Sequence, residues 1–239
     1  MAKPITEAEI EARYQNSYGR AAGYLPPSRK AVNAWQTELL RRARARTAGH
    51  VEPVQELADL LTADKALQDL VNETVQEALA LNPTGPASIE DVLNSLDEIV
   101  THAPGFSADP NSHVAFPMSA LFVYMMATES GWELFREAKF NDALRVVLTA
   151  WCTFLDSPES RDVLYRTPGG WLCPAAYDRN RLYEFQVDLG RPYGGFDSFN
   201  SFFHRPVKPE CRPNAARYEP RAVVSANDGQ VVRVYPDVR

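Results

Sequence analysis

Residues 64–83 read DKALQDLVNETVQEALALNP, and this stretch decides the fold class. Its less polar side chains recur every three or four positions, which places them on one face of an α-helix. These positions are Leu67, Leu70, Val71, Thr74, Val75 and Ala78. Asp64 is a favourable N-cap, and Pro83 disfavours helical backbone at the residue before it. The stretch therefore predicts an amphipathic helix with a defined start and end.

Similar spacing extends over most of the first two-thirds of the chain. We expect helices over residues 29–47, 54–61, 88–100, 117–130, 132–140, 143–155 and 158–164. Residues 101–117 are rich in Pro, Gly, Ser and Asn and predict a loop, and Gly131 is expected to end the apolar helix before it. The chain shows no internal repeat of the length typical of solenoids. The fold class predicted from these patterns is mainly α.

Composition limits the classes of protein to which the chain can belong. With 239 residues, of which 45% are hydrophobic, the chain is long enough to bury a core. The net charge of −6 does not favour nucleic-acid binding, so no such partner is expected. Residues 114–127 form the longest apolar stretch, which is shorter than the roughly 20 residues of a membrane span. The three cysteines, Cys152, Cys173 and Cys211, share no short spacing, so we expect a cytoplasmic protein without disulfides.

Charge is distributed unevenly along the sequence. Residues 1–51 hold nine basic and four acidic side chains, whereas residues 52–100 hold one basic and eleven acidic side chains. The helices of these two blocks are therefore expected to pack side by side. The basic run from Arg41 to Arg46 resembles a phosphate-binding patch, but its acidic neighbour favours ion pairing within the protein.

The pattern changes after about residue 166. Gly and Pro become frequent over residues 167–195, which predicts an irregular linker, and a short helical piece is expected over 196–205. Two β-branched runs at 222–224 and 231–235 flank an Asn-Asp-Gly turn, which predicts an incomplete β-hairpin. The predicted organisation is thus an N-terminal arm (1–28), a helical domain (29–166), the linker (167–195) and a further, truncated part (196–239).

Several other residues have side chains suited to metal binding, reactivity or ligand binding. His102 and His113 flank Asp109, but their spacing matches no metal-ligand pattern, so no metal is expected. Cys152 follows Trp151 on an apolar stretch and is expected to lie in the core. A small-molecule pocket between residues 114–130 and 143–155 is conceivable, although their Met and aromatic side chains are more typical of a core.

A second stretch carries a family resemblance. Residues 195–213 read GFDSFNSFFHRPVKPECRP and resemble the signature with which the catalytic domain of the phosphatidylserine decarboxylase family begins. Its motif residues, structural by this resemblance, are Phe199, Phe202, Phe203, Arg205, Lys208 and Arg212. The turn at Asp228 and Gly229 is similar to the Asp-Gly turn that follows in the family, although Asn227 departs from the usual alanine. The preceding helical region is similar to that of soluble fungal members of the L-tryptophan decarboxylase type, for example at Gly170-Trp171-Leu172.

The resemblance implies a carboxy-lyase that uses a pyruvoyl group as its electron sink. In the family this group forms by self-cleavage at a serine that follows a glycine, and Asp228 would orient the histidine that activates this serine. No serine of this chain follows a glycine, and none of its four histidines lies after Asp228. The pyruvoyl group is therefore not formable from this chain.

Two interpretations remain open at this point. In the first, the chain is the N-terminal portion of a decarboxylase that acts, when complete, on an aromatic amino acid such as L-tryptophan. It would then be inactive alone and would pair with a missing C-terminal catalytic segment. In the second, the chain is a non-catalytic helical binding or regulatory module derived from such an enzyme.

Overall fold

The computed structural model describes residues 6, 8–9, 28–109, 114, 116–213, 216 and 218–223. Within these residues the chain is helical, and its only β pairing is an isolated antiparallel bridge between Phe185 and Val207. The mainly α fold class is thus confirmed for the described part. Most of the expected hairpin, including Asp228 and Gly229, lies outside the described residues.

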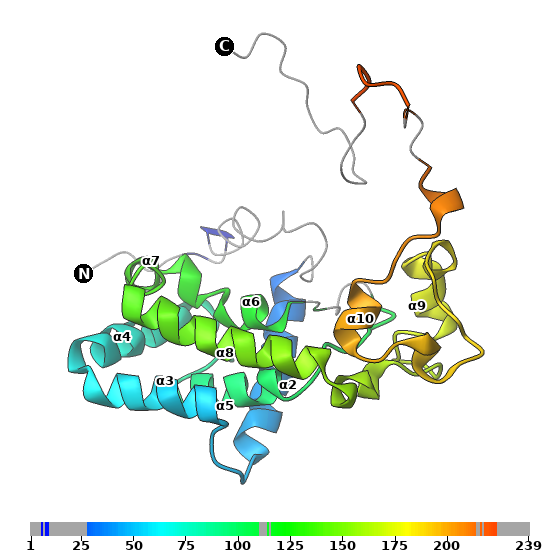
Figure 1. The fold of residues 1–239 in the computed structure, drawn as a ribbon. Coiled ribbons are helices and arrows are strands. Elements are labelled where there is room, and N and C mark those ends of the chain that lie inside the picture. The colour runs from blue at the N-terminus through cyan, green and yellow to red at the C-terminus, as the bar shows by residue number, and fades with distance from the viewer. Residues whose placement is uncertain are drawn as a thin grey trace.

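Helices follow one another along the chain (Figure 1). The first group is α2 (Arg29–Ala45), α3 (Glu52–Ala63), α4 (Lys65–Leu81), α5 (Ile89–Val100), α6 (Pro117–Phe122), η1 (Met125–Ala127), α7 (Glu129–Leu134) and α8 (Ala138–Asp156). The second group is η2 (Pro158–Val163), α9 (Pro174–Arg179), η3 (Leu182–Glu184), η4 (Pro192–Gly195), α10 (Phe199–Phe203) and η5 (Pro209–Cys211).

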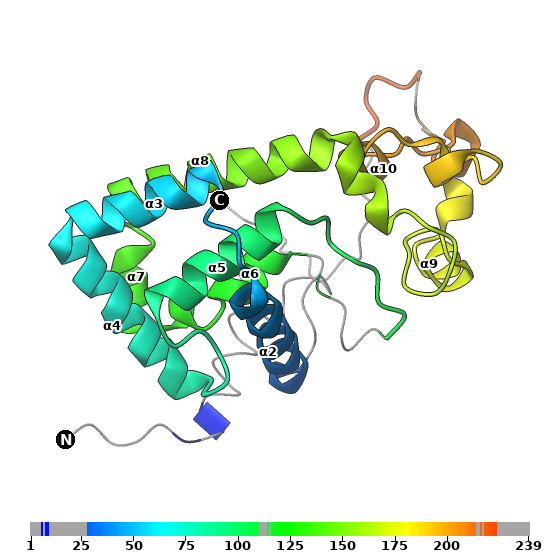
Figure 2. The same ribbon diagram turned by 90° about the horizontal axis from the view of Figure 1, so that it is seen from below.

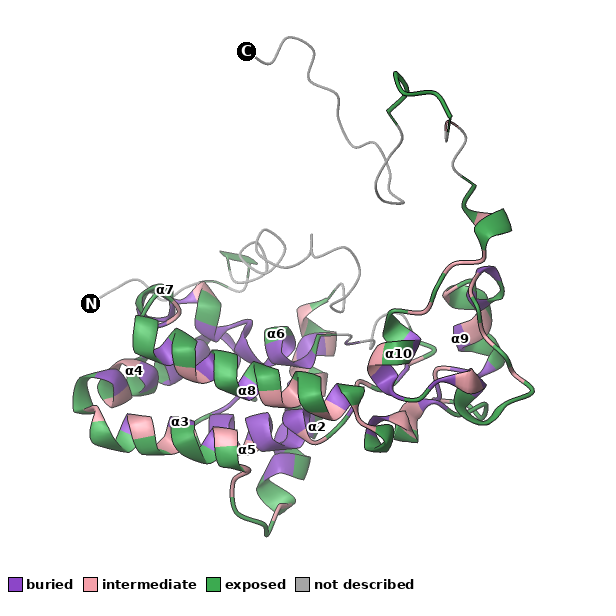
Figure 3. Ribbon diagram, viewed as in Figure 1, coloured by how far each residue is buried: buried purple, intermediate pink, exposed green. Residues whose placement is uncertain are grey.

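The first group encloses a hydrophobic core around α5. Helix α5 contacts α2, α3, α4, α6 and α8, while α3 packs on α8 and α4 packs on α7. Figure 3 shows α5 buried along most of its length, with the exposed faces on the outer helices. We call this the first core; its fully buried members include Leu39, Leu57, Leu96, Leu121, Leu134 and Val147.

The second group builds a smaller core at the far end of α8 (Figure 2). We call it the second core; it consists of Ala103, Leu155, Leu164, Leu172, Leu182, Phe196, Phe199 and Phe202. The segment 167–195, expected as an irregular linker, contains three short helices and contributes Leu172 and Leu182 to this core. It therefore shares the second core with the end of α8 and with α10, which contact each other directly.

Local capping signals set several helix ends. The side chains of Asp64 and Ser88 accept hydrogen bonds from the backbone N–H groups of Leu67 and Asp91, as expected for N-caps. Helix α4 ends at Leu81, directly before Asn82 and Pro83. These predicted boundaries of α4 and α5 are confirmed.

The prediction of one apolar helix over residues 117–130, ended by Gly131, is wrong. The chain forms α6, η1 and α7 in this region, and Gly131 lies inside α7. The N–H of Gly131 donates to the Oγ1 of the N-cap residue Thr128 over 3.0 Å. A Cβ atom at this position would lie 1.8 Å from the carbonyl oxygen of Met125. A glycine here permits close packing of η1 on α7 and does not end a helix.

Two further expectations about α8 are also wrong. The separate helices expected over 132–140 and 143–155 are replaced by α7 and one continuous α8 that begins at Ala138. Cys152 is exposed, because the buried positions of α8 are Phe140, Leu144, Val147 and Leu155. In the described part of the chain, no helix combines the length and apolar character needed to cross a membrane.

Candidate functional site

The phenylalanines of the signature divide between core and surface. Phe199 and Phe202 are buried in the second core, whereas half of Phe203 is exposed. Ser198 and Ser201 form a capping box at the start of α10. The N–H of Phe199 donates to the Oγ of Ser160 over 2.8 Å, which joins α10 to η2. The start of the signature is thus fixed to the helices before it.

Arg205 is held between two aromatic rings. Its guanidinium carbon lies 4.4 Å from the ring centre of Phe185 and 4.7 Å from that of Phe202. Its Nη1 donates to the carbonyl oxygen of Phe202 over 3.1 Å. Burial lowers the pKa of Arg205 from its ordinary value, yet an arginine stays charged in proteins. The cation therefore stabilises the end of α10 through ring contacts and a backbone hydrogen bond.

The Lys-Pro-x-x-Arg-Pro part of the signature pairs with the segment around Glu184. The backbone N–H of Lys208 donates to the carbonyl oxygen of Glu184 over 2.8 Å, and that of Gln186 donates to the carbonyl oxygen of Pro206 over 2.9 Å. The Nζ of Lys208 donates to the carbonyl oxygen of Tyr183 over 2.8 Å. The two backbone bonds form the short antiparallel bridge between Phe185 and Val207, and the Lys208 side chain adds a third attachment beside it.

Glu184 is a site residue that sequence reasoning missed. The residue is 4% exposed, and its carboxylate pairs with Arg181 and, over 2.7 Å, with the Nη2 of Arg212. Its only signal in the sequence is that it is the sole acid between Asp178 and Asp188. The structure thus brings together Phe199, Phe202, Arg205, Lys208 and Arg212, while Asp228 and Gly229 lie outside the described residues.

Trp171 connects the signature to the loop after α5. Its ring centre lies 5.6 Å from that of Phe202 and 5.4 Å from that of Phe106. Its Nε1 donates to the carbonyl oxygen of Pro104 over 2.7 Å. A side chain that packs against the second core therefore positions the loop that borders the first core.

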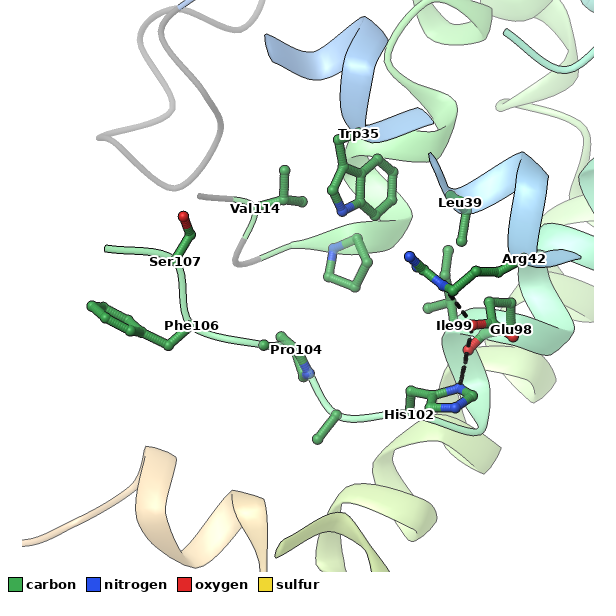
Figure 4. Close-up of a pocket in the computed structure, with 13 residues that line it drawn as sticks. Trp35, Leu39, Arg42, Glu98, Ile99, His102, Pro104, Phe106, Ser107 and Val114 are labelled. Carbon is green, nitrogen blue, oxygen red and sulfur yellow. Dashed lines mark hydrogen bonds and ion pairs between the residues drawn. The ribbon is translucent and has the colours of Figure 1, made fainter. Parts of the chain in front are cut away.

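That loop forms one wall of a pocket of about 400 Å3 (Figure 4). Helix α2 and the end of α5 form the facing wall. The residues that line the pocket are Trp35, Leu39, Arg42, Glu98, Ile99, His102, Ala103, Pro104, Gly105, Phe106, Ser107, Val114 and Pro117. Most of this surface is apolar, and the charged side chains gather at one end.

The charged end is organised around the carboxylate of Glu98. The Nε of Arg42 donates to Glu98 Oε1 over 2.8 Å, and His102 Nδ1 lies 3.9 Å from the same oxygen. His102 Nδ1 also lies 2.7 Å from the backbone carbonyl oxygen of Glu98 and donates a hydrogen bond to it. Glu98 is 8% exposed. A nearly buried carboxylate and a guanidinium thus face the pocket together.

The loop wall is held from behind by three side chains. Trp171 donates to Pro104, as described above, and Trp151 Nε1 donates to the carbonyl oxygen of His102 over 3.0 Å. Arg179 Nη1 donates to the carbonyl oxygen of Ser107 over 2.8 Å. Because these bonds fix the backbone of residues 102–107, this wall of the pocket is in place before any ligand arrives.

Other groups singled out in the sequence have structural partners. The basic run on α2 forms ion pairs, Arg44 with Asp91 on α5 and Arg41 with Glu38 on its own helix, so the expected internal pairing is confirmed. Among the described residues, no three His, Cys, Asp or Glu side chains are grouped as a metal site would require. His113 lies outside the described residues.

Comparison with known proteins gives three matches. A family model described as phosphatidylserine decarboxylase matches residues 51–179. The decarboxylase iboD of Amanita muscaria (strain Koide BX008) is 28% identical over 138 residues, which are 49% of this chain and 38% of that protein. The L-tryptophan decarboxylase of Psilocybe cubensis is 25% identical over 206 residues, which are 78% of this chain and 44% of that protein. The chain thus spans less than half the length of either relative.

Proposed function

The chain belongs to the phosphatidylserine decarboxylase family, whose model matches more than half of its residues, and from this we propose that it is the N-terminal portion of a pyruvoyl-dependent carboxy-lyase. The proposal includes a cytoplasmic location. Its proposed substrate is an aromatic amino acid such as L-tryptophan. A relative that matches 78% of the chain is named as an L-tryptophan decarboxylase, which supports this substrate class.

One observation carries the proposal beyond the family match. The signature residues Phe199, Phe202 and Arg205 pack into or onto the second core, to which α8 and the segment 167–195 also contribute. The helical part and the start of the signature are thus one packed unit. We propose that this unit fixes the position from which the chain continues toward Asp228, the orienting acid of the self-cleavage reaction.

The chain's own residues do not fit the pyruvoyl group. The group forms from a serine that follows a glycine, and the sequence contains no such pair. It also contains no histidine after Asp228. We therefore propose that both come from a further catalytic segment, that this segment is the partner of the chain, and that the 239 residues alone release no CO2.

Mass spectrometry of the protein isolated from its source tests the proposal. We expect a precursor longer than 239 residues that splits into two chains, and release of CO2 when the processed protein is incubated with L-tryptophan. In the same precursor, Asp228→Asn should block the splitting, whereas Asp237→Asn should not. A single uncleaved species without decarboxylase activity would support the alternative, a non-catalytic helical module.

A further inference from the structure

We propose that the pocket between α2, α5 and residues 102–107 binds a free aromatic α-amino acid. The site is separate from the signature residues and lies wholly in the helical part of the chain. The inference goes beyond the proposed function and does not depend on it, because binding can be measured on the 239 residues without any decarboxylation.

The size and walls of the pocket suit a flat apolar group. Small-molecule sites usually enclose about 300–1,000 Å3, and this pocket lies near the lower limit. The half-buried indole of Trp35 forms one side, with Leu39, Ile99, Pro104 and Val114 around it. Aromatic rings pack favourably against an indole in offset or edge-to-face geometry. These features favour an amino-acid-sized ligand over a nucleotide or a lipid.

The charged end of the pocket suits a zwitterion. The Nε of Arg42 donates to Glu98 Oε1, and the Nη1 of Arg42 donates to Glu38 Oε1 over 3.3 Å. Within the described residues, neither Arg42 Nη2 nor Glu98 Oε2 has a hydrogen-bond partner. A ligand carboxylate can therefore bind the guanidinium while a ligand ammonium binds the carboxylate. An anion such as phosphate would bind the Arg42 guanidinium but would be repelled by the nearby Glu98 carboxylate.

His102 adds a further polar contact. Because its Nδ1 proton is donated to the carbonyl oxygen of Glu98, the Nε2 of the neutral ring is an acceptor. His102 lies at the charged end, next to Glu98 (Figure 4). Its Nε2 is therefore available to an ammonium hydrogen atom of the ligand, which strengthens the preference for an α-amino acid over a plain carboxylic acid.

Calorimetric titration of the 239-residue chain with L-tryptophan tests the proposal. Tryptamine, which lacks the carboxylate, and indole-3-propionate, which lacks the ammonium group, serve as matched ligands. We expect L-tryptophan to bind, and each analogue to bind at least about tenfold more weakly because one charged hydrogen bond is lost. No heat from L-tryptophan at millimolar concentration, or equal affinity for all three compounds, would overturn the proposal.

Two variants locate the binding to this pocket. Gly105→Leu adds a side chain at a lining position where a Cβ atom meets nothing within 4 Å, so the fold tolerates it while the pocket is narrowed. Gly49→Leu is its control, since that glycine also has open space and lies outside the pocket. Trp35→Leu removes the indole, with Trp132→Leu, at a residue that is 65% exposed, as its control.

We expect Gly105→Leu to weaken L-tryptophan binding roughly tenfold with an unchanged thermal midpoint. Trp35→Leu should weaken binding to a similar degree but lower the midpoint, because Trp35 packs against the first core. Both controls should bind like the parent chain. Normal binding by Gly105→Leu would show that the ligand sits elsewhere and would contradict the proposal. If the complete protein releases no CO2 but the 239 residues bind L-tryptophan here, only the proposed function fails. If instead the complete protein releases CO2 but the 239 residues do not bind L-tryptophan, the decarboxylase proposal stands and this binding site is disproved.

Discussion

Asp91 joins three segments of the chain at the start of α5. Its two carboxylate oxygens accept from Arg44 Nε over 2.7 Å and Arg44 Nη2 over 2.6 Å, and Oδ2 also accepts from the N–H of Ala87 over 2.9 Å. The hydrogen bonds from Arg44 lower the pKa of Asp91 below its ordinary value of 3.8, and they outweigh burial, which raises it. The folded state thus holds this carboxylate in its charged form.

Asp91→Asn should make folding less sensitive to acid. Because the pKa of Asp91 is lower in the folded chain, its contribution to stability is complete above about pH 4 and is lost as the pH falls through the folded pKa. We expect the variant to lose about 2 kcal/mol at pH 7 and to show a flatter decline below pH 4 in urea unfolding. Part of the slope should remain, since Arg41 lowers the pKa of Glu38 to about 2.

Asp142→Asn is the control for this prediction. Asp142 pairs with Arg145 over 3.0 Å, but both side chains are more than 70% exposed. Such pairs contribute about 0–1 kcal/mol, so the pH dependence of this variant should match that of the parent chain. An identical acid profile for Asp91→Asn would show that the α2–α5 ion pair does not set the stability.

The residues that sequence reasoning missed have distant partners. The signature identified Arg205, Lys208 and Arg212, but not Glu184, whose partner Arg212 is 28 positions away along the chain. Trp171 stands in the sequence only as part of the Gly170-Trp171-Leu172 resemblance, which does not predict its hydrogen bond to Pro104. Periodicity and motifs report neighbours within a few residues, whereas these contacts arise only when distant segments of the chain fold against each other.

At the scale of elements, helices were predicted correctly where polar and apolar side chains alternate with the helical period. The helices α4 and α5 have N-cap side chains that fix their starts, so their ends could be read from the sequence, although Asp91, Asp97 and Glu98 of α5 are buried. Residues 117–127, which form α6 and η1, are apolar at nearly every position, so helical periodicity does not show where one helix ends and the next begins. The breaks depend on tertiary contacts such as that between Gly131 and Met125. The pocket could not be predicted from the sequence either, because its walls come from α2, α5 and a loop, which are separate segments of the chain.

Gly131→Ala should destabilise the chain through α7. The added Cβ atom would lie 1.8 Å from the carbonyl oxygen of Met125, and backbone must move to relieve this overlap. We expect a loss of about 3 kcal/mol in chemical unfolding, the upper end of the range for overpacked sites. Gly49→Ala, at a position with nothing within 4 Å, should change the free energy of unfolding by less than about 0.5 kcal/mol. Equal stability of the two variants would disprove the close approach.

Glu184→Gln should loosen the antiparallel bridge while leaving the rest of the fold intact. The substitution removes the charge that pairs with Arg181 and Arg212, so segment 206–212 loses one of its attachments. Hydrogen exchange of the Lys208 and Gln186 amides should accelerate by about tenfold, whereas amides of α5 should not change. Glu210→Gln, at an exposed position in the same segment, is the control. Unchanged protection in Glu184→Gln would mean that the backbone bonds hold the segment alone.

For the whole molecule, α8 makes the two cores interdependent. Leu144 and Val147 lie in the first core, and Leu155 on the same helix lies in the second. Two tryptophans add hydrogen bonds to the loop after α5: Trp151 donates from α8, and Trp171 donates from the segment between η2 and α9. We therefore expect the described part of the chain to unfold in one cooperative transition.

Leu182→Ala tests this cooperativity from the second core. Leu182 is fully buried, and truncation of such a side chain costs about 2–5 kcal/mol. Far-UV circular dichroism, which reports mainly the helices of the first group, and tryptophan fluorescence should shift to the same lower midpoint. Leu148→Ala, at an exposed position of α8, should leave both midpoints in place. Two separate transitions in Leu182→Ala would show that the cores fold independently.

The continuous α8 also limits how the length of this chain can change over evolution. Each residue added to an α-helix advances the chain by about 1.5 Å and rotates everything beyond it by about 100°. An insertion between Val147 and Leu155 would turn Leu155 and the whole second core away from their present partners. No such penalty applies to the connection between α2 and α3, where Gly49 has open space around it. Homologous sequences should therefore differ in length in that connection and keep a constant length within α8.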